Sequence, residues 1–361
     1  MAEWSRVVNT TTHEYLKGAE ENVLRNRKLL ALMKSKGRIS FDHGGDMLDW
    51  KVEYKQHPLE GYSDGQALSF ARSSLYKTAQ LEWRGYVVKD SMTKKERLMN
   101  RSAAQIIDIY AETTKLLMKS IDSQFGGEFY IDGNASGNED RMHGIESFMG
   151  QSGVSAGAPV GTAVDTYATL LTTLTNYGGA WTGTWPSGTG DSQYDFWSPL
   201  LVDYTSAVAA GSGGWSSATK TWPNTGNEAL RYAILYTQKN RTMDEQLDVF
   251  FLDTDLYRQW LDALDDKERI LVSKDGPLLK LGFRDTLNLD GTDVTTEYGI
   301  PASTGYGFNA DKMELMSLQK QLFVPEGPDW DIVTSSWRFK IDCLGNFQFN
   351  PRNFCKLKNY S

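Results

Sequence analysis

Cysteine and histidine are scarce in this chain of 361 residues. Its two cysteines are Cys343 and Cys355, and its four histidines are scattered along the sequence. Two cysteines cannot supply the disulfide framework of a small secreted scaffold, and no Cys-x-x-Cys pair or Cys/His quartet is present to hold zinc. No two histidines stand four residues apart, the spacing that places two metal ligands on one helix face. We therefore expect no metal site and two free thiols in a reducing compartment.

Long apolar runs and the motifs of common enzymes are also missing. The longest apolar runs, such as residues 249–252, fall far short of the roughly 20 residues that a membrane span needs. The first residues lack the basic and apolar regions of a signal peptide. No GxGxxG, GxxxxGK[ST], HExxH or GxSxG motif occurs. We therefore expect an intracellular, non-catalytic protein with no cofactor and no membrane partner.

Basic charge is confined to one end of an acidic chain. The whole sequence carries 46 acidic and 38 basic residues, a net charge of −8. Residues 1–40 reverse this balance, with eight Lys/Arg against four Glu, a local +4. Such a distribution argues against a protein that binds nucleic acid across its whole surface. It identifies the N-terminal arm as the basic segment.

Residues 150–226 form a nearly uncharged stretch rich in glycine, serine, threonine and tryptophan. This stretch contains four acidic residues, one basic residue and five of the eleven tryptophans, namely Trp181, Trp185, Trp197, Trp215 and Trp222. We interpret it as a loop-rich insertion. Exposed tryptophans can form a platform for sugars, but a hydrolase would also need flanking acids, which are absent. Core or interface aromatics are the favoured interpretation.

The N-terminal arm contains a predicted helix. Thr11 to Glu14 is a capping box, apolar Leu16, Val23 and Leu30 follow at intervals of seven, and Gly37 is the predicted stop. A helix with one apolar stripe more often packs on a neighbour or on the body of its own chain than binds nucleic acid.

A long β-hairpin follows the arm. Residues 49–55 alternate strictly between apolar and charged side chains, and a second extended run covers residues 76–89. The apolar side chains are too many for a solvated ribbon, and the connecting loop offers no core of its own. We therefore expect a neighbouring subunit to cover the hairpin. The predicted interface residues are Trp50, Lys51, Val52, Glu53, Tyr54, Lys55, Leu81, Glu82, Trp83 and Arg84.

One helix of about thirty residues is predicted next. Thr93 to Glu96 is a second capping box, and an apolar stripe runs through Ala103, Ile107, Tyr110, Leu117 and Ile121 until Gly126-Gly127. At 1.5 Å per residue this helix would be roughly 45 Å long. It is either an ordinary long core helix or a spine across an extended subunit.

Regular structure resumes after residue 225. We expect a helix capped at Thr225 and running towards residue 240, a buried strand over 249–252, and a helix over 256–264. Shorter strands are predicted around 270–272, 278–283 and 312–318, and a long strand over 333–343 that turns at Gly345-Asn346. Asp253 and Asp255 imitate a paired-carboxylate or metal site but fit a helix N-terminus better. Residues 285–293 faintly resemble a calcium loop, yet a polar turn fits them better.

The order of these parts resembles the major capsid protein of tailed bacteriophages, the Hong Kong 97-type capsid fold. Segments 229–233, 249–253, 306–309 and 350–352 stand in the matching order, and the resemblance covers nearly the whole chain. It implies an α+β fold with N-arm, extended loop, spine helix, peripheral domain and axial domain. The corresponding ranges are 1–40 for the N-terminal arm, 41–92 for the extended-loop hairpin, 93–132 for the spine helix and first part of the peripheral domain, 133–325 for the axial domain with the insertion at about 150–226, and 326–361 for the closing strands.

The resemblance implies a structural protein of the virion. Copies would assemble as hexamers and pentamers into an icosahedral shell that encloses double-stranded DNA non-specifically. Assembly in the bacterial host cytoplasm would use a separate scaffolding protein and a portal. A lumen-facing basic arm would comprise Arg25, Arg27, Lys28, Lys34, Lys36 and Arg38. One alternative is an encapsulin-like nanocompartment shell; a more distant one is a Trp-rich carbohydrate-binding protein or hydrolase.

Overall fold

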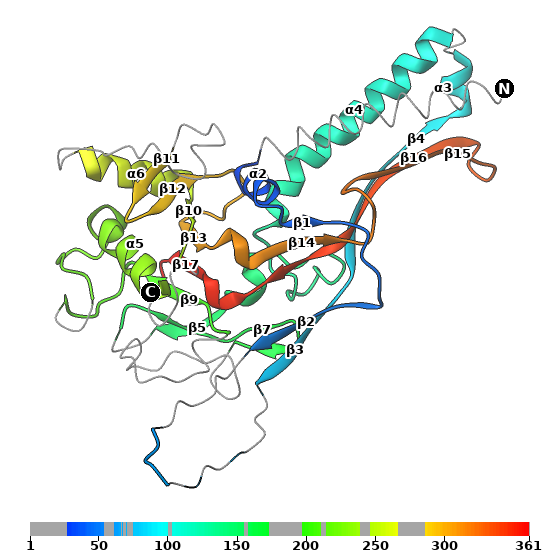
Figure 1. The fold of residues 1–361 in the computed structure, drawn as a ribbon. Helices are drawn as coiled ribbons and strands as arrows, with labels where there is room; N and C mark the ends of the chain where they lie inside the picture. The colour runs from blue at the N-terminus through cyan, green and yellow to red at the C-terminus, as the bar shows by residue number, and fades with distance from the viewer. Residues whose placement is uncertain are drawn as a thin grey trace. The chain divides into compact units, whose positions relative to one another are not determined.

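Figure 1 shows the ribbon of the computed structural model. The contacts within the chain divide it into two compact units. The structure describes residues 27–53, 61–65, 67, 70, 75–99, 103–154, 158–172, 197–210, 214–238, 246–265 and 286–360. Unit 1 takes its described residues from Met1–Asp46, Trp83–Gly144 and Met313–Gln348. Unit 2 takes its own from Met47–Glu82, Ile145–Lys312 and Phe349–Ser361. Each unit is therefore built from three separate stretches of sequence.

A long strand organises the sheet of unit 1. The strands are β1 (Ile39–Ser40), β4 (Arg84–Thr93), β14 (Met313–Ser317), β15 (Val324–Asp331) and β16 (Ser336–Phe349). Along the sheet the order is β1-β14-β16-β15, and β4 also pairs with β16. Strand β4 runs antiparallel to β16 over ten residue pairs, while β15 pairs with the same part of β16 on its other edge.

The helices of unit 1 are α2 (Lys28–Ser35), α3 (Lys94–Met99) and α4 (Ala103–Glu128). Helix α2 ends where predicted: Gly37 has a φ of +67°, and its N–H donates to the Lys34 carbonyl at 3.1 Å. The capping box before α3 is also confirmed. The Thr93 N–H donates to Glu96 Oε2 at 2.8 Å, and the Glu96 N–H donates to Thr93 Oγ1 at 3.3 Å.

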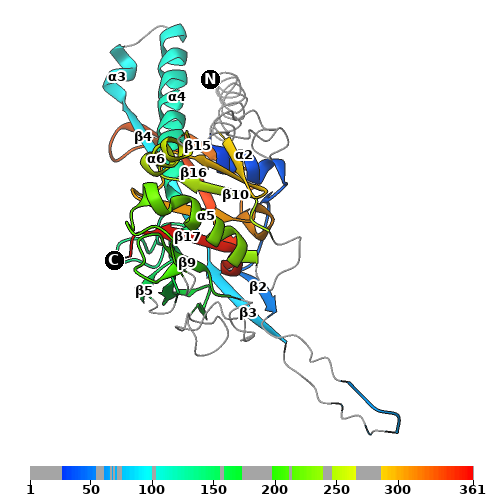
Figure 2. The same cartoon turned by 90° about the vertical axis from the view of Figure 1, so that its left-hand side faces the viewer.

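The prediction of a single helix from Thr93 to Gly126-Gly127 is wrong: the structure has two helices, and the second continues past the glycine pair. Two helices, α3 and α4, lie side by side near the start of α4 (Figure 2), and α4 continues through the glycine pair to Glu128. Its 26 residues are about 39 Å long. Asn100 and Ser102 are residue types favoured at helix ends. The prediction of one helix followed the apolar periodicity and gave no weight to these two residues.

The described part of α4 packs by the predicted stripe. Leu117 and Ile121 are buried, as expected, together with Phe125. The Phe125 ring meets Tyr86 and Phe323 edge-on, with ring centroids 5.9 and 5.4 Å apart. The side chains of Ala103, Ile107 and Tyr110, expected on the same stripe, lie outside the described residues. Helix α4 is thus held to the sheet by an aromatic cluster.

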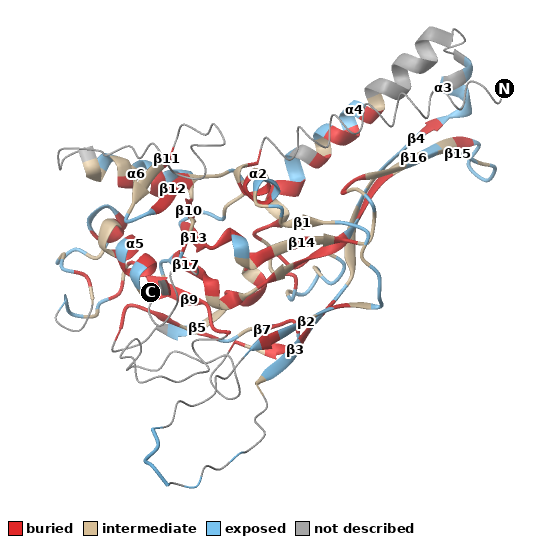
Figure 3. Ribbon diagram, viewed as in Figure 1, coloured by how far each residue is buried: buried red, intermediate tan, exposed pale blue. Residues whose placement is uncertain are grey.

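Unit 2 is built on a mixed six-stranded sheet. Its order is β11-β12-β10-β13-β17-β9, with β10 parallel to β12 and β17 parallel to β9. Figure 3 shows buried residues along β10, β13 and β17. The strands are β9 (Leu200–Asp203), β10 (Val249–Leu252), β11 (Thr286–Leu289), β12 (Thr292–Thr296), β13 (Thr304–Phe308) and β17 (Phe354–Lys358). All four residues of β10 are buried, which confirms the predicted buried strand.

Smaller elements and two helices complete unit 2. Helices α5 (Trp222–Gln238) and α6 (Thr254–Asp265) pack against each other. The two-stranded pairs are β2 (Met47–Glu53) with β3 (Tyr76–Glu82), β5 (Gln151–Val154) with β6 (Gly161–Ala163), and β7 (Thr166–Tyr167) with β8 (Leu170–Leu171). Short 3₁₀ turns cover Ile145–Phe148, Ala310–Lys312 and Pro351–Asn353.

Several predictions for the central region are confirmed and one is corrected. Asp290 and Gly291 both have positive φ and form the tight turn of a β11–β12 hairpin, so the polar turn is right. Helix α6 begins directly after Asp253, as capping predicted. The helix predicted to be capped at Thr225 starts instead at Trp222. Thr225 lies inside it, and its buried hydroxyl donates to the Tyr204 carbonyl at 2.7 Å. The strand predicted over 312–318 is β14, and those over 270–272 and 278–283 lie outside the described residues.

The closing strand differs from its prediction at both ends. Strand β16 begins at Ser336, so Val333 precedes it, and it continues to Phe349 without turning at Gly345-Asn346. A Cβ at position 345 would collide with the Met316 carbonyl oxygen, so glycine here permits close strand pairing rather than a turn. Asn346 Oδ1 accepts hydrogen bonds from the His143 and Phe347 N–H groups at 3.0 and 2.9 Å.

Aromatic and sulfur-containing side chains fill the two cores. Cys343 and Cys355 are free and buried, which confirms the predicted thiols. Trp197, Trp215 and Trp222 are buried, so these members of the tryptophan-rich stretch serve the core of unit 2. Trp181 and Trp185 lie outside the described residues.

The core of unit 2 also contains an ion pair. Lys356 Nζ lies 2.5 Å from Glu146 Oε2 and donates to the Met149 carbonyl oxygen at 3.4 Å. The Tyr306 hydroxyl donates to the other oxygen of Glu146. Burial lowers the pKa of Lys356, and the Glu146 carboxylate partly opposes this shift. Removing one member would leave the other charge buried without its partner.

We predict that Lys356→Met lowers the free energy of unfolding by about 3–5 kcal/mol, the usual cost of breaking a buried pair on one side. Urea unfolding followed by circular dichroism measures the change. Lys358→Met is the matched control, because Lys358 is exposed on the same strand. Equal stability of the two variants would contradict the structural role given to the pair.

Candidate subunit interface

The β2–β3 hairpin closes its apolar face within its own unit. The two strands pair antiparallel from Met47 opposite Glu82 to Glu53 opposite Tyr76. On one face the side chains of Leu48, Val52, Ala79 and Leu81 are buried. Trp50, on the same face, lies with its ring centroid 6.3 Å from that of Tyr167. The expectation that only a neighbouring subunit covers these apolar residues is therefore wrong.

The covering segment is the β7–β8 turn. Ala168 and Thr169 in this turn both have positive φ, and the Ala168 carbonyl accepts a hydrogen bond from the Gln80 N–H at 3.0 Å. Tyr167 is fully buried, and its hydroxyl accepts a hydrogen bond from the Phe349 N–H at 3.1 Å. Sequence reasoning missed this cover because it treated the whole of residues 150–226 as an insertion and searched for a partner only within the hairpin.

The second predicted strand of the hairpin is really two strands. Strand β3 ends at Glu82 and pairs with β2, whereas β4 begins at Arg84 and pairs with β16. Between them the Trp83 indole N–H donates to the Gly45 carbonyl at 3.1 Å. A continuous hairpin strand over residues 76–89 is therefore wrong, since half of that run belongs to the sheet of unit 1.

Arg84 binds backbone of its own unit. Its Nη1 donates to the carbonyl oxygens of Gly133, Arg141 and Asn138 at 2.7, 3.0 and 3.4 Å. By donating hydrogen bonds to three carbonyl oxygens, the Arg84 guanidinium fixes the loop between α4 and residue 144 against the start of β4. Arg84 was predicted to set the register between copies, and these contacts instead give it a role inside the subunit.

A second polar cluster holds the same loop. The Arg141 guanidinium makes two hydrogen bonds to the Glu128 carboxylate, one of them from Nε to Oε2 at 2.9 Å. The bond to Glu128 raises the pKa of Arg141. The Tyr86 hydroxyl accepts from the Met142 N–H at 3.1 Å, and burial, reinforced by the nearby Glu128 carboxylate, raises the pKa of Tyr86. The end of α4 and the start of β4 are therefore rigidly tied together.

The outer face of the hairpin remains open. Asp49, Lys51 and Glu53 are exposed at alternate positions of β2, and Glu82 is exposed on β3. Alternation of charge at a two-residue spacing creates a row that a copy of itself can meet with opposite charges. Of the predicted interface residues, Lys51, Glu53 and Glu82 occupy this outer face. Tyr54 and Lys55 lie outside the described residues.

The loop at the end of the hairpin exposes aromatic side chains. Its described residues between 61 and 70 are all exposed, and Tyr62 and Phe70 retain 74% and 92% of their accessible surface. Large aromatic side chains on an open loop are typical anchors of protein–protein contacts. Sequence reasoning treated the loop as polar and missed both, although their type was a sufficient signal.

The predicted basic arm is described only from residue 27. Arg27 is buried, and its Nη2 donates to the Ser123 carbonyl at 3.2 Å, so it anchors α2 on α4 within unit 1. Lys34 is exposed, and Lys28, Lys36 and Arg38 are half-buried. Arg25 lies outside the described residues.

The described part of the chain contains neither a metal-binding cluster nor a membrane-spanning helix. No group of three or more His, Cys, Asp or Glu side chains there has the arrangement of a metal site. No described helix combines the length and apolarity that crossing a bilayer requires.

Comparison with known proteins identifies the fold. The sequence matches no protein-family model, and no curated protein matches it. Among solved structures, the capsid asymmetric unit of cyanophage A-1(L) is similar with a TM-score of 0.56 at 14% identity, covering 93% of both chains. The capsid of the native GTA particle is similar with a TM-score of 0.53 at 11% identity, covering 91% of both chains. The chain therefore has the mixed helix and sheet fold of these phage and GTA capsid subunits.

Proposed function

We propose that this chain is a major capsid protein whose copies self-assemble into the icosahedral head of a tailed bacteriophage. The observation that carries the proposal is a capsid-subunit fold matched over more than nine-tenths of the chain. A second observation supports it: the hairpin is folded on its own unit yet leaves a charged face and two aromatic residues exposed. A monomer gains nothing from such surfaces, whereas a shell subunit needs them.

Within this proposal, each part of the Hong Kong 97-type fold corresponds to an element of the structure. The β2–β3 hairpin and its loop form the extended loop, and α4 forms the spine helix. The sheet around β16 belongs to the peripheral domain, and the six-stranded sheet of unit 2 to the axial domain. Residues 1–40 form the N-terminal arm. The ranges expected from the sequence, 41–92, 93–132, 133–325 and 326–361, are kept in this proposal with one change: β4 and β14 pass to the peripheral domain, because both belong to the sheet of β16.

The exposed aromatic and charged side chains of the hairpin suit contacts between copies that are individually weak but add up when many form in one shell. Burial of Tyr62 or Phe70 against a neighbour contributes about 1.5–3 kcal/mol each before association costs. The charged row of Asp49, Lys51 and Glu53 selects the register between copies. In a closed shell every copy makes these contacts at once, so modest pairwise affinities suffice.

The charge of the chain suits a container for DNA. A net charge of −8 keeps the shell from binding packaged double-stranded DNA tightly. The basic residues Arg25, Lys28, Lys34, Lys36 and Arg38 are proposed to lie on the lumen side of the arm, whereas Arg27 is buried on α4 and is excluded from this set. Hexamers and pentamers form in the host cytoplasm with a separate scaffolding protein and a portal. The subunit itself performs no catalysis.

Particle formation tests the proposal directly. The chain is expressed with a scaffolding protein if needed, sized by chromatography, and the largest fraction imaged by electron microscopy. Closed particles of megadalton size are expected. A monomer that binds sugars would overturn the proposal, although the burial of Trp197, Trp215 and Trp222 already argues against an aromatic sugar platform there. Native particles that hold a single cargo protein instead of genome-length DNA would indicate an encapsulin-like shell.

We predict that replacing residues 56–74 by a short glycine-containing turn leaves the subunit folded but unable to close shells. The reason is that β2 and β3 bury their apolar face on Tyr167 of their own unit, so folding does not need the loop. Circular dichroism and thermal melting report folding, and electron microscopy reports shells. Normal particles, or an unfolded variant, would each refute this division of roles.

We also predict that Lys51→Glu reduces particle yield at least tenfold without changing the melting temperature. The substitution turns the alternating row Asp49, Lys51, Glu53 into three like charges, which repel any copy that presents the same row. Lys77→Glu is the matched control, because position 77 is exposed on the opposite face of the same hairpin. Particle yield is measured by sedimentation. Equal loss in both variants would show that the outer charge row has no special part in assembly.

A further inference from the structure

The turn between β15 and β16 presents two large aliphatic side chains to solvent. Ile332 and Val333 retain 81% and 92% of their accessible surface. They are adjacent, and both belong to the β-branched residues that normally fill cores. We call this pair the aliphatic tip. Its exposure needs an explanation, because the turn is ordered by several polar contacts.

Hydrogen bonds and an ion pair of the neighbouring residues hold the backbone of the tip in place. Asp331 Oδ1 accepts from the Val333 N–H at 3.1 Å, and Asp331 Oδ2 accepts from the Thr334 hydroxyl at 2.5 Å. Arg338 on β16 pairs with the same carboxylate at 2.5 Å. The Ser335 carbonyl accepts from the Lys94 N–H at 3.0 Å, which ties the turn to the start of α3. The turn is therefore held in one conformation, and a braced surface loses little entropy on binding.

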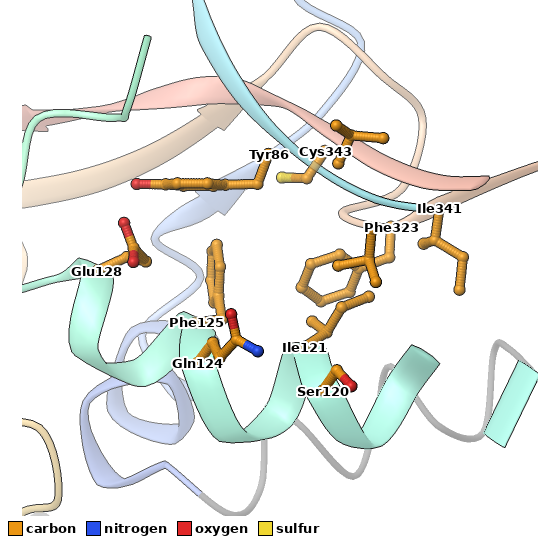
Figure 4. A pocket seen from close by; sticks show the side chains of 11 residues that line it. Tyr86, Ser120, Ile121, Gln124, Phe125, Glu128, Phe323, Ile341 and Cys343 are labelled. Carbon is orange, nitrogen blue, oxygen red and sulfur yellow. The ribbon is translucent and has the colours of Figure 1, made fainter. Parts of the chain in front are cut away.

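The same unit contains a groove of matching character between α4 and the sheet (Figure 4). Its floor is apolar, formed by side chains from α4, β4 and β16 together with Phe323. Ser120, Gln124 and Glu128 of α4 form a polar margin. The apolar side chains that line it include Val88, Ile121, Phe125, Phe323, Ile341 and Cys343.

The groove has room for a small apolar side chain. Its cavity is about 100 Å³, whereas an engineered apolar cavity that accepts benzene has about 150 Å³. A branched aliphatic side chain such as that of Val333 or Ile332 fits the volume and the apolar lining.

The tip cannot reach the groove of its own chain. Ser336 and Ile341 stand five residues apart on β16, about 16 Å along an extended strand, and the tip lies beyond Ser336. Because β16 is paired on both edges over this stretch, it cannot fold back. An aliphatic tip that occupies this groove must therefore belong to another copy of the chain.

Two aliphatic side chains also bury too little area for a stable pair of proteins, which needs roughly 800 Å² per partner. Such a contact is effective only when many are made together. We propose that the aliphatic tip of one subunit inserts into the α4–β4–β16 groove of a second copy of this chain. The contact joins two different surfaces of one chain, so it is heterologous and repeats around a ring or shell. This inference rests on the proposed shell function.

Cysteine cross-linking tests the contact in assembled particles. One chain carries Val333→Cys and a second, with a tag of different size, carries Gln124→Cys; the two are expressed together. Gln124 is chosen because it is an exposed residue of the groove margin. Mild oxidation followed by a non-reducing gel and mass spectrometry identifies the linked peptides. We expect a disulfide between positions 333 and 124 of differently tagged chains at least tenfold above the control pair, Leu344→Cys with Gln124→Cys. Leu344 is 41% exposed on the strand that lines the groove and alternates with the groove-lining Cys343.

The outcomes separate this proposal from the shell function. Particles that form normally but give no link between positions 333 and 124 would overturn the tip-in-groove contact and leave the shell function intact. Predominant links between position 333 of one chain and position 333 of another would overturn it in favour of contact between tips. Failure of the unmodified chain to form particles would remove the shell function and this contact with it.

A second measurement uses the tip alone. Ile332→Ser combined with Val333→Ser should keep the melting temperature, because both side chains are exposed in the subunit. Particle yield should fall at least tenfold, because the groove of each neighbour loses its occupant. An unchanged yield would contradict the proposal.

Discussion

Closure of the hairpin's apolar face on its own subunit is the constraint on which the functional account depends. An isolated two-stranded ribbon is marginal in water, and the β2–β3 pair escapes this limit by burying Val52, Ala79 and Leu81 and by placing Trp50 against Tyr167. The strands are therefore part of the folded subunit before any neighbour arrives. Only their charged face and the aromatic loop remain for contacts between copies. Folding and assembly can then use different residues of one element.

The sheet around β16 provides the corresponding rigidity in unit 1. One 14-residue strand pairs with β4 and β15, and α4 is fixed to this sheet by the rings of Phe125 and Tyr86. Arg84 and the Glu128–Arg141 pair then tie the following loop to the same strands. In the proposed shell, a rigid sheet would matter because a preordered turn and a preformed groove would bind their partners without a large entropic cost.

Local signals in the sequence predicted the elements that local interactions determine. The capping box at Thr93, the buried run of Val249 to Leu252 and the turn at Asp290-Gly291 were predicted from a few neighbouring residues each. Pairing between distant segments was not predictable in this way. Strand β4 pairs with a strand about 250 residues later, and Tyr167 covers a hairpin more than 80 residues before it. The prediction that a neighbour covers the apolar face of the hairpin was therefore wrong, whereas a contact through its charged face is a proposal. Gly345 was read as a turn because its closest constraint, the Met316 carbonyl, comes from another strand.

Hydrogen exchange on unassembled subunits and on assembled particles tests the central claim most directly. The account predicts that amides of β2 and β3 are protected in both states, because the hairpin folds on its own subunit. It predicts that amides of the loop, including those near Tyr62 and Phe70, gain protection only on assembly. Unprotected strands in the unassembled subunit would show that a neighbour folds the hairpin and would contradict the claim, as would a loop whose exchange is the same in both states.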